Sequence, residues 1–99
     1  MLYAIVAEDV EHSLDKRKAA RPAHMLRMQQ LIADGRVILA GPMPSIDSPD
    51  PGPSGFSGSL IVADFESLEA AREWIEADPY VAQGVFARVS VKPFIQVLP

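Results

Sequence analysis

The chain has 99 residues, 48% of them hydrophobic, and its 9 basic and 13 acidic side chains give a net charge of −4. This length suits one compact domain over residues 1–99. The acidic balance argues against nucleic acid as a partner, and the lack of cysteine excludes disulfides, thiolate metal sites and a cysteine nucleophile. No apolar run approaches the roughly 20 residues of a membrane span, and the first residues lack the basic start of a signal peptide. We therefore expect a cytoplasmic protein with no membrane partner.

The first part of the chain predicts a strand and a long helix. Residues 2–7 form an apolar run with β-branched and aromatic members, which is typical of a buried central strand. Residues 14–33 are rich in helix formers, and Ser13 and Gly35 stand where a cap at each end is expected. Pro22 falls inside this stretch, so it either kinks the helix or begins its main segment.

A second strand over residues 36–41 leads into a segment dominated by proline and glycine. Five of the nine prolines stand at positions 42, 44, 49, 51 and 53, a composition that predicts no regular element between residues 41 and 58. Because proline lowers the entropy of the unfolded chain, this loop can still be ordered. Long loops in small domains are usually functional, which favours a rigid wall of a site. An ordinary long connection is the competing interpretation.

Two strands and one helix complete the prediction. Residues 59–65 form a third strand, and Ser67 caps a second helix over residues 68–77 that Asp78-Pro79 ends. Residues 85–92 alternate between apolar and polar side chains, as in a half-buried fourth strand. Pro93 is expected to interrupt this strand, which leaves residues 94–98 as an extra strand or arm.

The element order β-α-β-β-α-β predicts a ferredoxin-like α+β fold, in which two helices cover one face of an antiparallel sheet. The other face carries apolar side chains and has no helix to cover it. A second sheet from a partner subunit is the simplest cover, so we predict a homodimer.

The strand directions bring several polar residues to one rim of the sheet. Asp9 follows the first strand, and Asp78 follows the second helix at the same end. His24 lies on the sheet-facing stripe of the first helix. A histidine paired with a carboxylate can act as a general acid or base near neutral pH. Asp78 and Asp9 are both candidate partners, and a purely structural role for His24 is the competing interpretation.

Five further residues are candidates for binding a substrate. Arg17 and Arg21 continue the stripe of His24 toward the rim, where they act either as an anion clamp or as surface salt-bridge partners. Tyr80 lies in the connection between the predicted second helix and fourth strand. It either packs in the core or lines the pocket. Pro42 and Ser45 belong to the proline-rich wall.

The residues point to no metal centre and no cofactor. The two histidines, His12 and His24, are on different elements, which does not match a zinc site. There is also no phosphate-binding loop and no Ser-His-Asp pattern of known spacing. Acid–base chemistry by histidine and aspartate on a small molecule is the function that these residues favour.

Stretches along nearly the whole chain resemble the YciI (YCII-related) family. The resemblance is carried by residues 3–9 (YAIVAED), 14–17 (LDKR), 21–24 (RPAH), 35–36 (GR), 40–44 (AGPMP), 55–59 (GFSGS), 78–81 (DPYV), 84–85 (GV) and 89–94 (VSVKPF). The last three are the most specific. Each fragment is short, and their order and spacing carry the match.

The resemblance implies a ferredoxin-like fold that dimerises as an α/β barrel, with an active site centred on a histidine and an aspartate. The histidine corresponds to His24, and the Asp-Pro-Tyr turn favours Asp78 over Asp9 for the aspartate. A related member dehydrochlorinates an aromatic compound, and similar barrels include muconolactone isomerases. The expected function is therefore a cofactor-independent lyase or isomerase acting on a small, anionic or cyclic molecule. A non-catalytic ligand-binding or protein-interaction module of the same fold is the alternative.

Overall fold

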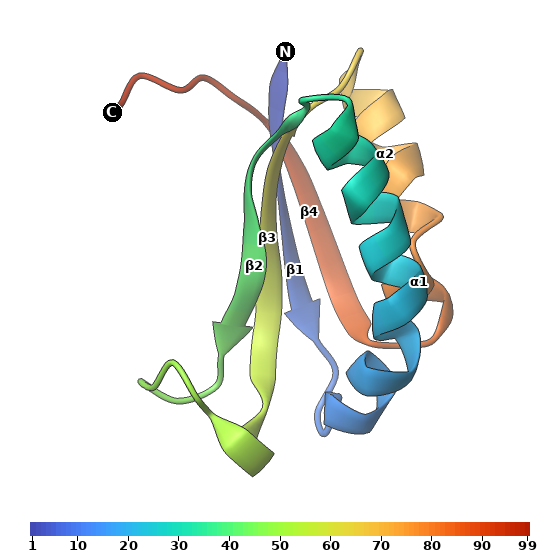
Figure 1. The fold of residues 1–99 in the computed structure, drawn as a ribbon, viewed down its shortest axis with the longest axis vertical. Helices are drawn as coiled ribbons and strands as arrows, with labels where there is room; N and C mark the ends of the chain where they lie inside the picture. The colour runs from blue at the N-terminus through green and yellow to red at the C-terminus, as the bar shows by residue number, and fades with distance from the viewer.

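The computed structural model describes residues 1–99 and contains four strands and two main helices (Figure 1). The sheet has the order β2-β3-β1-β4, and every neighbouring pair is antiparallel. This arrangement confirms the predicted ferredoxin-like α+β fold. In chain order the elements are β1 (Leu2–Asp9), α1 (Leu14–Ala33), β2 (Val37–Pro44), the 3₁₀ turn η1 (Gly52–Ser54), β3 (Phe56–Asp64), α2 (Leu68–Glu76), α3 (Pro79–Ala82) and β4 (Phe86–Phe94).

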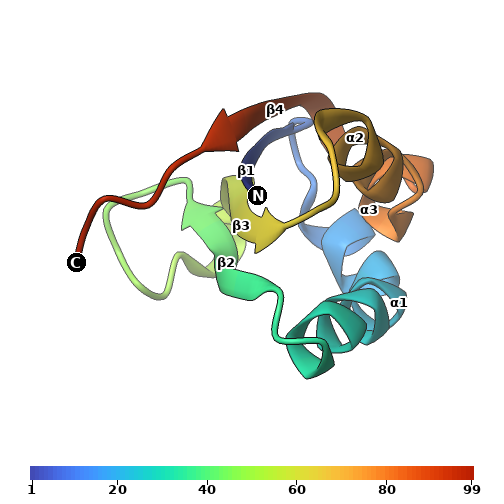
Figure 2. The ribbon, with the colours of Figure 1, turned by 90° about the horizontal axis from the view of Figure 1, so that it is seen from above.

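All the helices lie on one side of the sheet, and no helix covers the other side (Figure 2). Ile5 on β1 stands opposite Ile61 on β3 and Val91 on β4, and these side chains face the helices. The next residue, Val6, points the other way and is 40% exposed. Alternate burial along β1 therefore replaces the fully buried strand that its sequence predicts. None of the helices is both long and apolar enough to cross a membrane.

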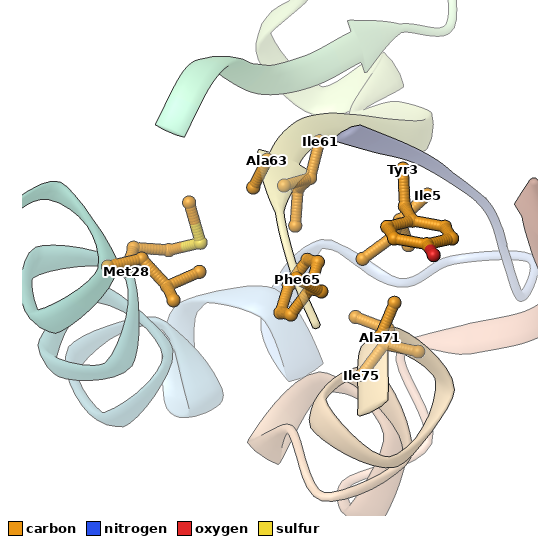
Figure 3. Packing of buried hydrophobic residues seen from close by; sticks show 9 residues of the cluster. Tyr3, Ile5, Met28, Ile61, Ala63, Phe65, Ala71 and Ile75 are labelled. Atoms are coloured by element: carbon orange, nitrogen blue, oxygen red, sulfur yellow. The ribbon is translucent and has the colours of Figure 1, made fainter. Parts of the chain in front are cut away.

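The hydrophobic core lies between the helices and the sheet (Figure 3). Burying one large aliphatic side chain there stabilises the fold by about 1.5–3 kcal/mol. The buried positions Met28 and Leu31 of α1, and Ala71 and Ile75 of α2, mark the helix faces that reach the sheet. The core residues are Tyr3, Ile5, Met28, Leu31, Ile61, Ala63, Phe65, Ala71 and Ile75.

The helix α1 is continuous from Leu14 to Ala33, with Pro22 in its interior. Proline has no N–H, so the carbonyl of Lys18 loses its usual helical partner. Both residues are exposed, and water can satisfy that carbonyl. The helix therefore runs on, and its length brings residues 17–28 along the sheet.

The prediction that no regular element survives between residues 41 and 58 was wrong. The strand β2 continues through Pro42 to Pro44, β3 begins at Phe56, and η1 lies between them. Because β2 is at an edge of the sheet, a residue without an N–H can be accommodated there.

The same reason explains why Pro93 does not interrupt β4, contrary to the prediction. The strand β4 is the other edge of the sheet and runs to Phe94, with Pro93 opposite Tyr3. Residues 95–99 form no strand and extend away from the sheet (Figure 1).

Candidate active site

Asp78 lies in the turn between α2 and α3 and is fully buried, with 0% of its surface exposed. Its carboxylate caps α3, because Oδ2 accepts a hydrogen bond from the backbone N–H of Tyr80 at 3.0 Å. Pro79 occupies the first position of that helix, where its missing N–H is harmless. Asp78-Pro79 thus begins a short helix, whereas the sequence predicted only the end of the preceding one.

Two side chains of α1 complete the environment of the buried carboxylate. His24 Nδ1 lies 2.8 Å from Oδ2 of Asp78, and Arg27 Nη1 donates to Oδ1 at 2.8 Å. Burial raises the pKa of Asp78, but the hydrogen bonds from His24, the Tyr80 N–H and Arg27, with the charge of His24, outweigh it. The pKa therefore lies below its ordinary value of 3.8, and the carboxylate is ionised at neutral pH.

An ionised carboxylate can only accept hydrogen bonds, so in neutral His24 the proton is on Nδ1. The other ring nitrogen, Nε2, then keeps its lone pair. The side chain of His24 is 13% exposed, whereas that of Asp78 is fully enclosed. Nε2 is therefore the nitrogen that remains available to a ligand.

Aromatic rings hold His24 and Arg27 in place. The imidazole of His24 stacks on the ring of Tyr80, with centroids 4.1 Å apart and planes 11° from parallel. Arg27 lies over the ring of Trp74 at 4.5 Å. Arg27 was not among the predicted site residues, although its position three residues after His24 puts it on the same face of the helix.

Asp9 is not the partner of His24, which corrects the alternative left open by the sequence. Its Oδ2 accepts from Arg17 Nε at 2.6 Å and its Oδ1 from Arg17 Nη2 at 2.9 Å. The Ser13 hydroxyl also donates to Asp9, at 2.5 Å, and makes no capping bond to α1. The exposed fractions of Arg17 and Asp9 are 8% and 1%, so Arg17 is a buried ion-pair member and neither a surface residue nor a free anion clamp.

A cleft of about 240 Å³ lies between α1 and the strands β2 and β3. Five of the predicted site residues line it, namely Arg17, Arg21, His24, Pro42 and Tyr80. Arg21 is exposed. The remaining lining is mainly apolar, and the full set is Arg17, Arg21, His24, Met25, Met28, Ile32, Ala40, Gly41, Pro42, Ser59, Ile61 and Tyr80.

Ser45 does not line this cleft. It borders a separate hollow of about 260 Å³ beside Asp9 and His12. The rim predicted from the strand directions therefore exists, but it is divided between two depressions. Only the cleft contains the histidine that faces Asp78.

The ring of Tyr80 forms part of the cleft wall. Burial raises the pKa of Tyr80 above 10.0, an effect that the charges of Arg17 and Arg21 oppose and that Asp78 and Asp9 reinforce. The phenol is therefore neutral at physiological pH. Tyr80 both packs in the core, against Phe86, and lines the cleft.

Comparison with known proteins agrees with this architecture. The model of the YCII-related domain matches residues 1–95. Protein YciI of Escherichia coli O6:H1 is 59% identical over 97 residues, which cover 98% of this chain and 99% of that protein. A protein of Haemophilus influenzae is 48% identical over the same share of each chain.

One solved structure resembles the fold over nearly its whole length. It is the 5-chloro-2-hydroxyhydroquinone dehydrochlorinase TftG of Burkholderia phenoliruptrix AC1100, in complex with 2,5-dihydroxybenzoquinone. It is 25% identical, covers 96% of this chain and 94% of its own, and gives a TM-score of 0.84. With the family match over residues 1–95 and the 59% identity to Protein YciI, the chain belongs to the YCII-related family.

Proposed function

We propose that this protein is a cofactor-independent lyase or isomerase in which His24 moves a proton on a small cyclic molecule. The observation that carries the proposal is the contact between His24 Nδ1 and the buried carboxylate of Asp78, at 2.8 Å. This contact fixes the tautomer of the imidazole and leaves Nε2 as a base on the wall of the cleft.

Asp78 acts as the positioning group. Its carboxylate already accepts bonds from Arg27 and from the Tyr80 N–H, which keep it ionised. A carboxylate in that state orients the imidazole and stabilises the imidazolium that forms when Nε2 takes a proton. General acid–base catalysis of this kind contributes about 10²–10⁴-fold to a rate.

The shape and lining of the cleft favour a small ring with polar substituents. Methionine and isoleucine side chains offer apolar contact, while Arg21, Ser59 and His24 offer polar contact. The similar structure of TftG, a dehydrochlorinase with a bound dihydroxybenzoquinone, supports an oxygenated ring as the substrate class. Elimination and isomerisation both need a positioned base, which His24 supplies.

The test is a turnover screen of chlorinated hydroquinones, lactones and ring-containing acids, run on matched histidine variants. His24→Asn is expected to lower kcat by at least about 100-fold, because the base is lost. His12→Asn is the control, since His12 is exposed and its φ of 55° is one that asparagine tolerates. Turnover that survives His24→Asn would contradict the proposal. Binding of these compounds without any turnover would favour the non-catalytic module.

We also propose that two copies pair through the open face of the sheet. That face presents Val6 on β1, which is 40% exposed, and Leu39 on β2, which is 48% exposed, with β3 between these strands. A second copy of the same sheet would bury both sets of side chains symmetrically. The helix-side cleft would remain open in such a dimer.

A further inference from the structure

Arg17 forms an ion pair with Asp9 and also contacts the wall of the cleft. Besides its two bonds to Asp9, its Nη2 donates to the carbonyl of Gly58 and to Ser59 Oγ, both at 2.9 Å. Both Arg17 and Ser59 line the cleft that contains His24. This network lies outside the His24–Asp78 pair, and the proposed proton transfer does not yet use it.

Two donors of this network have no acceptor within the protein. The bonds of Arg17 involve Nε and Nη2, which leaves Nη1 unpaired. Ser59 Oγ accepts from Arg17 and donates to no protein atom. Every fully enclosed side-chain polar atom in the structure has a partner, so Nη1 of Arg17 is open at the surface. Arg17 lines this cleft and not the neighbouring hollow beside Asp9, which supports an opening of Nη1 toward the cleft.

The charge of this pair of donors is also distinctive. Asp9 neutralises Arg17 through two short bonds, so Arg17 and Ser59 together offer hydrogen-bond donors with little net positive charge. Such donors bind a neutral carbonyl weakly and gain strength as its oxygen becomes negative. A free cation would instead bind an anionic ground state just as well.

We propose that Arg17 Nη1 and Ser59 Oγ form an oxyanion-binding pair for a ring carbonyl or phenol oxygen of the substrate. The inference rests on the proposed function of His24 and names the group that receives the negative charge. Arg17 thus replaces the anion clamp predicted from the sequence, and Ser59 is a binding residue that the sequence did not indicate.

The step balances without any co-reactant. His24 Nε2 takes the proton from a ring carbon next to a carbonyl, and the electron pair of that C–H bond forms a carbon–carbon double bond. The carbonyl π pair moves onto the oxygen, which Arg17 and Ser59 then hold as an enolate. In an isomerisation His24 returns the proton to another ring carbon. In an elimination the oxygen pair re-forms the carbonyl, and the carbon–carbon pair of the enolate forms a double bond to the neighbouring ring carbon. The C–Cl bond of that carbon breaks to release chloride, and the proton on His24 passes to water.

The experiment uses 2,5-dihydroxybenzoquinone as the probe, titrated at pH 7 and followed by its visible absorbance. Ser59→Ala is expected to raise its Kd at least tenfold and to return the absorption maximum of the bound quinone toward that of the free compound. Ser59→Thr keeps the hydroxyl and is expected to stay within twofold of the wild type. Ser57→Ala is the control, because Ser57 lies two residues earlier on β3 and bonds Met43 outside the cleft.

The possible results separate the two proposals. A Ser59→Ala protein that binds the quinone as tightly as Ser57→Ala would overturn the oxyanion pair, while a loss of turnover in His24→Asn would leave the proposed function standing. Equal weakening by Ser59→Thr and Ser59→Ala would also overturn the pair, because the hydroxyl would then be irrelevant. Failure of the wild-type protein to bind the quinone would contradict the oxyanion pair and the oxygenated-ring substrate together.

Discussion

Among single residues, Asp78 links the stability of the fold to the proposed chemistry. Three donors from two separate elements meet its carboxylate, and it has no exposed surface. A buried charge is tolerated only when its lone pairs are satisfied in this way. The same bonds that stabilise the anion also orient His24, so stability and the proposed chemistry depend on one group.

Asp78→Asn is therefore expected to destabilise the fold by roughly 2–3 kcal/mol at pH 7, because charge-assisted bonds are lost. The pKa of Asp78 is depressed in the folded protein relative to 3.8. The stability that ionised Asp78 contributes is thus fully present above pH 3.8. This stability is lost as the pH falls through the pKa of Asp78 in the folded state. Urea unfolding at a series of pH values should show the unfolding free energies of the wild-type and Asp78→Asn proteins converging as the pH falls below the folded-state pKa of Asp78. Asp47→Asn, at an exposed position, is the control. A stability difference between the wild type and Asp78→Asn that stays constant down to pH 2 would contradict the depressed pKa of Asp78.

At the scale of elements, the packing of β1, β3 and α1 against one another depends on Gly58. A Cβ added there would lie 2.1 Å from the carbonyl oxygen of Ala7 on β1. The carbonyl of Gly58 also accepts the bond from Arg17 on α1. One residue without a side chain therefore lets the two strands approach and lets the helix attach to them.

Gly58→Ala is expected to destabilise the protein by about 1–3 kcal/mol, since the strands must separate to admit the methyl group. Gly41→Ala is the matched control on the neighbouring strand β2, because a Cβ there meets nothing within 4 Å. Chemical denaturation of the two variants tests the difference. Equal stability of Gly58→Ala and Gly41→Ala would contradict this prediction, because β1 and β3 would then admit the methyl group without loss of stability.

The elements were largely predictable from the sequence, because hydrophobic periodicity reports which side chains face a core. Sequence alone does not show which strands lie at the edges of the sheet, and this is why Pro42 and Pro93 were misjudged. In the candidate site, the stripe on α1 predicted His24 and the family resemblance favoured Asp78, and these two side chains lie 2.8 Å apart. The bonds from Arg17 to Asp9 and Ser59 were not foreseen, since they join elements whose spacing only the folded chain defines.

At the scale of the whole molecule, the two faces of the sheet have different roles. The helix side contains the core, the buried ion pairs and the cleft. The opposite side has no covering layer in a single chain (Figure 2). The exposed apolar side chains on that side, Val6 and Leu39, favour an interaction site there, and pairing through that side would leave both clefts accessible.

The proposed homodimer predicts a specific sensitivity to charge on the open face. Val6 lies at the middle of the sheet opposite Leu60 and Ser90, so Val6→Lys would place two like charges in a symmetric interface. We expect the wild-type protein to sediment as a dimer at micromolar concentration and Val6→Lys to raise the dissociation constant at least tenfold. Leu26→Lys is the matched control, because Leu26 is on α1 and 63% exposed. A monomeric wild-type protein, or equal dissociation constants for the two lysine variants, would show that the open face is not the interface.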